Sequence, residues 1–69
     1  MNEQTIGELA GDVWEYLRRN GGQADLHSIR NGVRAREGIS ADVGAGWLAR
    51  EGMVFFHFDQ GAVQVELRS

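Results

Sequence analysis

Hydrophobic residues near the start of the chain recur at the spacing of an α-helix. Three or four positions separate the members of this apolar stripe, which are Ile6, Leu9, Ala10, Val13, Trp14 and Leu17. Thr5 and Glu8 have the spacing of a capping box, in which each side chain accepts a hydrogen bond from a free backbone N–H at the helix start. Asn20-Gly21-Gly22 follows the stripe, and glycine adopts the left-handed conformation that ends many helices. The pattern predicts a first helix that begins at Thr5 and ends before Asn20.

A second, shorter helix is expected after Asp25, which has the residue type of an N-cap. The side chains expected to point inward are Leu26, Ile29 and Val33. The end of this helix is open, because Asn31-Gly32 and Gly38 are both suitable stops. We favour an irregular helix that reaches about Arg36.

A third helix is predicted over residues 41–51, with Ser40 as its N-cap and Asp42 in its first turn. The residues expected to be buried are Val43, Trp47 and Leu48. Those expected to face outward are mainly Ala41, Asp42, Ala45 and Ala49. In a helix-turn-helix protein this would be the recognition helix.

Two β-rich runs, residues 53–58 and 62–68, close the chain. Between them Asp59-Gln60-Gly61 forms a short turn in which the glycine is expected at positive φ. In the second run apolar residues alternate with polar ones, so one face of this strand is expected to be exposed to solvent. The apolar members are Val63, Val65 and Leu67.

The first run of the hairpin does not alternate as cleanly. If Val54, Phe56 and Phe58 face the core, then Met53, Phe55 and His57 point the other way. An outward methionine and phenylalanine would form an exposed apolar patch, which often marks a contact surface. The alternative, that a neighbouring loop or the N-terminal residues cover them, stays open.

This order of elements predicts one mainly α domain over residues 1–69, a winged helix-turn-helix with three helices and a two-stranded antiparallel wing. A chain of 69 residues buries only about 60% of its unfolded surface. Small domains without disulfides or metals often gain stability by oligomerising.

Gly7 and Gly11 lie inside the first predicted helix, where each costs roughly 1 kcal/mol relative to alanine. They are four residues apart and therefore share a face. One explanation is close packing against another helix of the same chain, and the other is self-association. Gly44 and Gly46 in the third helix offer a complementary surface.

The residues Ile6, Ala10-Gly11, Val13-Trp14, Leu17 and above all the run Gly46-Trp47-Leu48-Ala49-Arg50-Glu51 resemble a family of short bacterial winged helix-turn-helix domains of unknown function. The resemblance covers nearly the whole chain. This chain has Gly44-Ala45 where the family has Ala-Leu, and Gly52-Met53 where the family has an acidic residue and lysine. The resemblance implies the fold and brings no substrate or catalytic residue.

The charge balance argues against extensive DNA contact. The formal net charge is −3, and the seven basic residues are all arginines, against ten carboxylates, whereas affinity for DNA comes mainly from basic side chains on phosphates. A local site remains possible through Arg30, Arg34 and Arg36 before the third helix, together with Arg50. The alternative is that these arginines solvate the surface and pair with Glu37 and other acids.

No pattern indicates an enzyme or a cofactor. Two histidines without cysteine give no metal signature, and Ser28 and Ser40 are explained as helix-start residues. No apolar run approaches the roughly 18 residues of a membrane span, and the acidic N-terminus does not resemble a signal peptide. We therefore expect a cytoplasmic protein without a small-molecule substrate.

Two functions remain. The first is a protein-interaction module, most simply a homodimer through Met53, Phe55 and His57 or through Gly7 and Gly11. The second is a DNA-binding regulator that uses the third helix and the arginines. Acidity and the lack of base-reading side chains favour the first.

Overall fold

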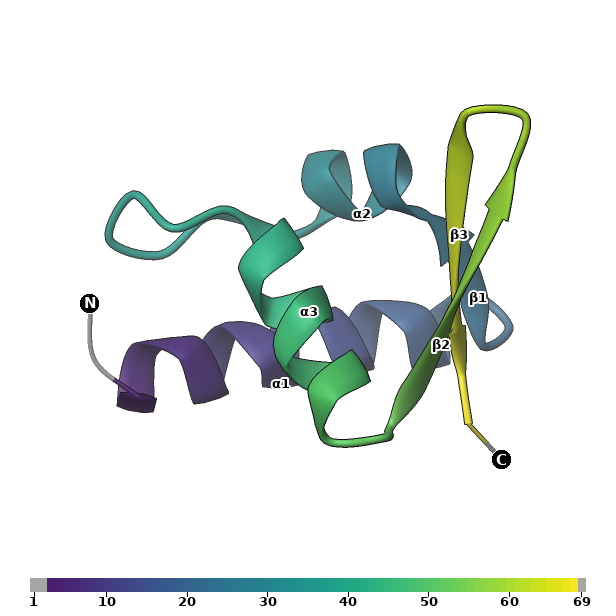
Figure 1. The fold of residues 1–69 in the computed structure, drawn as a ribbon. Coiled ribbons are helices and arrows are strands. Elements are labelled where there is room, and N and C mark those ends of the chain that lie inside the picture. The colour runs from purple at the N-terminus through teal and green to yellow at the C-terminus, as the bar shows by residue number, and fades with distance from the viewer. Residues whose placement is uncertain (1–2, 69) are drawn as a thin grey trace.

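The computed structural model describes residues 3–68, which form three helices and one three-stranded antiparallel sheet (Figure 1). The three helices and the C-terminal hairpin expected from the sequence are all present. In chain order the elements are α1 (Glu3–Arg19), β1 (Gln23–Asp25), α2 (Leu26–Gly32), α3 (Ala41–Arg50), β2 (Val54–Asp59) and β3 (Ala62–Leu67).

The sheet has one strand more than predicted. β1 pairs with β3 in antiparallel register, with Ala24 opposite Val65, and gives the strand order β1-β3-β2. The Leu67 N–H also donates to the Gly22 carbonyl over 2.7 Å. The predicted two-stranded wing is present as the antiparallel pair of β2 and β3. The prediction missed β1, because a three-residue strand is too short to show an alternation.

The apolar stripe of α1 is confirmed, but its predicted capping box is wrong. Leu9, Val13 and Leu17 are completely buried. Thr5, however, lies inside a helix that already includes Glu3, and its buried hydroxyl donates to the carboxylate of Glu37. Thr5 therefore connects α1 to the loop before α3, a contact between residues 32 positions apart.

Helix α2 begins where predicted and ends earlier than predicted. Asp25 is its N-cap, with Oδ1 accepting from the Ser28 N–H at 2.6 Å. The helix stops at Gly32, and Val33 is extended, with φ −117° and ψ 121°. The ring of Tyr16 lies on Gly32 so closely that a Cβ there would be 2.2 Å from Tyr16 Cε1. The predicted extension to Arg36 was therefore wrong.

Helix α3 crosses α1 (Figure 1) and packs on it at Gly44. A Cβ on Gly44 would lie 3.0 Å from the Ala10 nitrogen and from the carbonyl carbon and oxygen of Leu9. The inward face of α3 consists of Ala41, Gly44, Ala45 and Leu48.

This close approach corrects the predicted faces of α3. Ala41 and Ala45, expected outside, are buried, whereas Val43, expected inside, is 39% exposed. The prediction placed the larger apolar side chains inward, but here the smallest ones allow the two helix backbones to approach.

The hairpin turn lies where predicted, with its glycine at positive φ, but Asp59 belongs to β2 and the turn itself consists of Gln60 and Gly61. Gln60 and Gly61 have φ of 49° and 82°, as a two-residue turn between twisted strands requires. Val54 is buried and Phe56 packs against the core, but Phe58 is 77% exposed. The inward prediction for Phe58 was wrong because the tip of the hairpin projects beyond the helices (Figure 1).

We predict that Gly44→Ala destabilises the fold by up to about 2 kcal/mol. Overpacking costs about 1–3 kcal/mol, and the better helix propensity of alanine returns at most about 1 kcal/mol. Gly46→Ala is the matched control, because a Cβ there meets no atom within 4 Å, and it should raise stability by up to about 1 kcal/mol. Denaturant unfolding of both variants measures the difference. Equal effects would contradict the close approach of α3 to α1.

The cap of α2 gives a pH dependence. The Ser28 hydroxyl and, next, the Ser28 backbone N–H hold the pKa of Asp25 below its ordinary value of 3.8. A pKa lowered by folding stabilises the protein fully above the unfolded-state pKa, and this stabilisation is lost as pH falls through the folded-state pKa.

We therefore predict that the wild type loses stability relative to Asp25→Asn as the pH falls below about 4. Asparagine can still cap the helix but does not titrate in this range. Denaturant midpoints measured across this pH range test the prediction, and parallel pH curves for the two proteins would contradict it.

Candidate interaction surfaces

An apolar groove of about 360 Å³ lies between α1, the end of α3 and the start of β2. Its lining residues are Gly7, Ala10, Gly11 and Trp14 on α1, with Trp47, Leu48, Glu51 and Met53 on the opposite side. Gly7 and Gly11 are exposed, and a Cβ at either position would meet no atom within 4 Å. The two glycines therefore leave the surface of α1 open between two tryptophans and a methionine.

This geometry rejects one of the two explanations for the glycines of α1. Gly7 and Gly11 do not pack closely against another helix of the described chain. The close contact is made by Gly44, on the backbone of Leu9 and Ala10, while Gly46 is exposed. The other explanation, self-association through Gly7 and Gly11, stays a prediction.

The outer face of β2 continues the groove. Met53 lines the groove and is 43% exposed, and Phe55, two residues further on, is 46% exposed. His57 is exposed too, so all three side chains have the outward orientation that was predicted. Polar groups border this patch: the Arg68 guanidinium lies 5.6 Å from the centre of the Phe55 ring, and His57 Nε2 lies 2.8 Å from Glu66 Oε1.

The arginines predicted to contact nucleic acid do not form one free cluster. Arg30 Nε lies 2.9 Å from Asp42 Oδ1. Arg36 Nε lies 2.8 Å from Asp12 Oδ2, and Arg36 Nη1 is 3.6 Å from Glu8 Oε1. The hydrogen bond from Arg36 to Asp12 raises the pKa of Arg36 further above its ordinary value.

The remaining two arginines are more available. Arg34 is exposed, and Arg50 lies with its guanidinium 5.7 Å from the centre of the Trp47 ring. Pairing with acids was one of the predicted alternatives, and Arg30 and Arg36 do pair with acids. The acid named in that prediction, Glu37, accepts instead from the Thr5 hydroxyl.

The outward face of α3 carries few groups that read bases. Its exposed residues are Val43, Gly46 and Arg50, and the partly exposed Asp42 is paired with Arg30. Side chains that bind base edges are normally arginine, lysine, asparagine or glutamine. Among these four residues of α3, only Arg50 is of a type that binds base edges.

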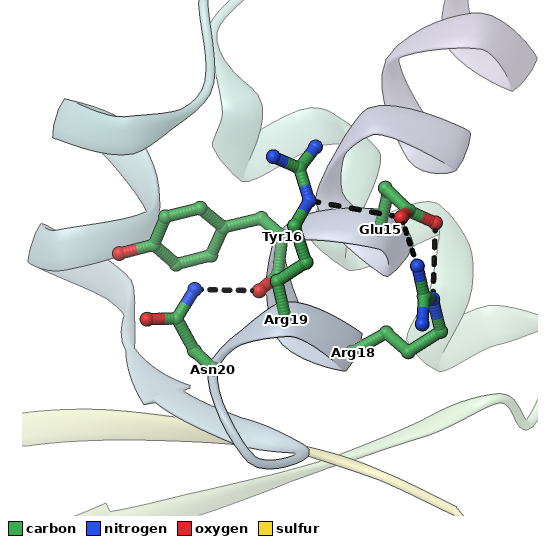
Figure 2. Close-up of polar contacts among 5 residues, drawn as sticks. All are labelled: Glu15, Tyr16, Arg18, Arg19 and Asn20. Atoms are coloured by element: carbon green, nitrogen blue, oxygen red, sulfur yellow. Dashed lines mark hydrogen bonds and ion pairs between the residues drawn. The ribbon is translucent and has the colours of Figure 1, made fainter.

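A second, polar cleft of about 420 Å³ lies between the end of α1 and the segment that follows α2. Sequence reasoning missed it, because its walls join residues far apart in the chain, such as Asp12 and Arg34. Figure 2 shows Arg18 and Arg19 both directed at the Glu15 carboxylate, while the Asn20 side chain donates to the Tyr16 carbonyl over 2.7 Å.

Most of the charged groups that line this cleft are paired: Glu15 with Arg19 and with the neighbouring Arg18, and Asp12 with Arg36. The Arg18 guanidinium donates to both oxygens of Glu15, and Arg19 Nε lies 3.6 Å from Oε1. The hydrogen bond from Arg18 is the main cause that lowers the pKa of Glu15. These pairs are exposed and stabilise the fold only weakly, so we regard this region as a solvated surface.

Residues 3–68 contain no group of three or more histidine, cysteine or acidic side chains arranged to hold a metal ion. Within the same residues, none of the helices combines the length and the apolar character needed to cross a membrane.

Comparison with known proteins agrees with the architecture. Residues 1–67 match the model of a family described as winged helix-turn-helix domain (DUF2582). Neither the curated proteins nor the solved structures gave a significant match. The helices, the sheet and the family match confirm both the winged helix fold and the resemblance seen in the sequence. The chain belongs to the DUF2582 family of winged helix-turn-helix domains.

Proposed function

We propose that this domain is a non-catalytic interaction module that binds a partner protein in the groove between α1 and α3. Winged helix domains generally bind DNA or proteins. The observation that carries the proposal is the open apolar groove, in which Trp14, Trp47 and Met53 surround exposed glycines.

The cost of the glycines supports this proposal. Gly7 and Gly11 together cost about 2 kcal/mol of helix propensity, a large share of the roughly 5–15 kcal/mol that holds a domain folded. Among residues 3–68, no packing at these positions requires a missing side chain. A partner that approaches the helix backbone closely would explain the cost.

The composition of the groove supports it as well. Tryptophan and methionine are enriched at the centres of protein interfaces, where burial of aromatic side chains carries most of the binding energy. Phe55 extends the apolar surface beyond Met53. The rim carries Glu51, and polar rims of this kind are usual around interface cores.

A DNA-binding regulator is the second candidate. It is favoured by the exposure of Arg34 and Arg50, neither of which has an ion pair within the described part of the chain. Arg30 and Arg36 would have to leave or share their acidic partners to join them. The net charge of −3 works against this function.

Site-specific photocrosslinking in the native host cells distinguishes the two functions. The photoreactive residue p-benzoylphenylalanine replaces Glu51 at the rim of the groove or, as a matched control, Val43 on the outward face of the same helix. We expect protein adducts from position 51 and none from position 43. Nucleic-acid adducts from position 43 without protein adducts from position 51 would contradict the proposal.

Titration of labelled duplex DNA supplies the complementary test. We expect no saturable binding even at low ionic strength, where attraction to phosphate is strongest. The double variant Arg34→Gln/Arg50→Gln is the control. If the wild type binds and this variant does not, the DNA-binding function replaces the one proposed here.

A further inference from the structure

The α1 wall of the groove is arranged symmetrically about one point. Its residues are Gly7, Ala10, Gly11 and Trp14, so the midpoint of the set lies between Ala10 and Gly11. Gly7 and Trp14 are equally far from this point: Gly7 leaves open space, and Trp14 offers the exposed part of an indole that otherwise packs against the core. The large side chain of Trp14 and the open space at Gly7 thus lie at equal distances on opposite sides of the midpoint.

Two charged residues continue this stripe at equal distances. Glu3 is four residues before Gly7 and Arg18 is four residues after Trp14, so both share the face of the groove. Each lies about 11 Å along the helix from the midpoint at 1.5 Å per residue. Both are exposed. Arg18 pairs with Glu15 on its own helix, an exposed pair that leaves it able to share a second carboxylate.

From this symmetry we infer that the occupant of the groove is a second copy of the chain, bound through α1 in an antiparallel two-fold pair. The inference rests on the proposed function. In this arrangement the exposed part of Trp14 of each copy lies against the space above Gly7 of the other, and Glu3 of each copy faces Arg18 of the other. Two-fold symmetry forms each of these contacts twice.

Self-complementarity of size and charge distinguishes a second copy from an unrelated partner. A parallel pair of the same helices would place Glu3 against Glu3 and indole against indole. Only the antiparallel pair places opposite charges together and sets the indole against the glycine. Trp47 and Met53, on the opposite side of the groove, would then cover the exposed part of that indole. A small domain that binds its own copy also gains the stability that its limited core does not supply.

Charge reversal tests the pairing of Glu3 with Arg18. By sedimentation equilibrium, Glu3→Arg and Arg18→Glu should each weaken the dimer by about tenfold or more, because two attractions become two repulsions. The double variant Glu3→Arg/Arg18→Glu should return to within about threefold of the wild type. If these charges acted only through the dipole of α1, the double variant would be weaker than either single variant, because it has the least favourable charge at both ends of the helix. Recovery in that variant therefore reports pairing between copies.

Arg19→Glu is the matched control, because Arg19 also pairs with Glu15 but is turned away from the stripe by about 100°. It should leave dimerisation unchanged. A double variant no stronger than the single ones, or a dimer insensitive to all of these changes, overturns the antiparallel pair.

Gly7→Gln separates association from folding. Within residues 3–68 a Cβ at position 7 meets no atom within 4 Å, so glutamine there should raise the thermal midpoint of a dilute sample through better helix propensity. The same side chain fills the space for the second copy's indole and should abolish the dimer. Gly46→Gln should raise the midpoint without affecting the dimer. A fully dimeric Gly7→Gln overturns the inference.

The outcomes also separate this inference from the proposed function. A wild type that stays monomeric up to about 1 mM overturns self-association, whereas photocrosslinks from position 51 to a different protein would keep the interaction function. Absence of protein crosslinks from position 51 contradicts the interaction function itself.

Discussion

The contact of Gly44 with the backbone of Leu9 and Ala10 positions most of the other elements. Because no side chain separates the helices there, α3 lies directly on α1 and turns its smallest residues inward. Leu48 then enters the core with Val54, at the start of the hairpin. One missing methyl group thus determines how the last helix, and the strand that follows it, sit on the first helix.

The same approach creates the apolar groove. Once Gly44 and Ala45 face α1, Trp47 lies at the edge of the interface between the helices and not in its centre. Trp47 lines the groove together with Trp14 and the exposed glycines of α1. Close packing and open surface are therefore two consequences of glycines on neighbouring helices: Gly44 is buried, whereas a Cβ at Gly7 or Gly11 would meet no atom of the described residues within 4 Å.

Paired charges and apolar side chains occupy different parts of the surface. Two of the four arginines that a nucleic acid would need are held by acids of the same chain, in the contacts of Arg30 with Asp42 and of Arg36 with Asp12. The groove, by contrast, has an apolar lining and carries charge only at its rim. In this winged helix domain of net charge −3, the apolar groove is thus lined by residues other than the paired arginines.

The sequence alone determined the three helices, the N-cap at Asp25 and the hairpin turn at Gln60-Gly61, because each depends on residues within about four positions. Only the tertiary structure decided the face of α3 that Gly44 turns inward, the pairing of β1 with β3 and the partners of the arginines. It also decided that Gly7 and Gly11 are open. These features depend on residues 12 to 43 positions apart, whose proximity follows from packing.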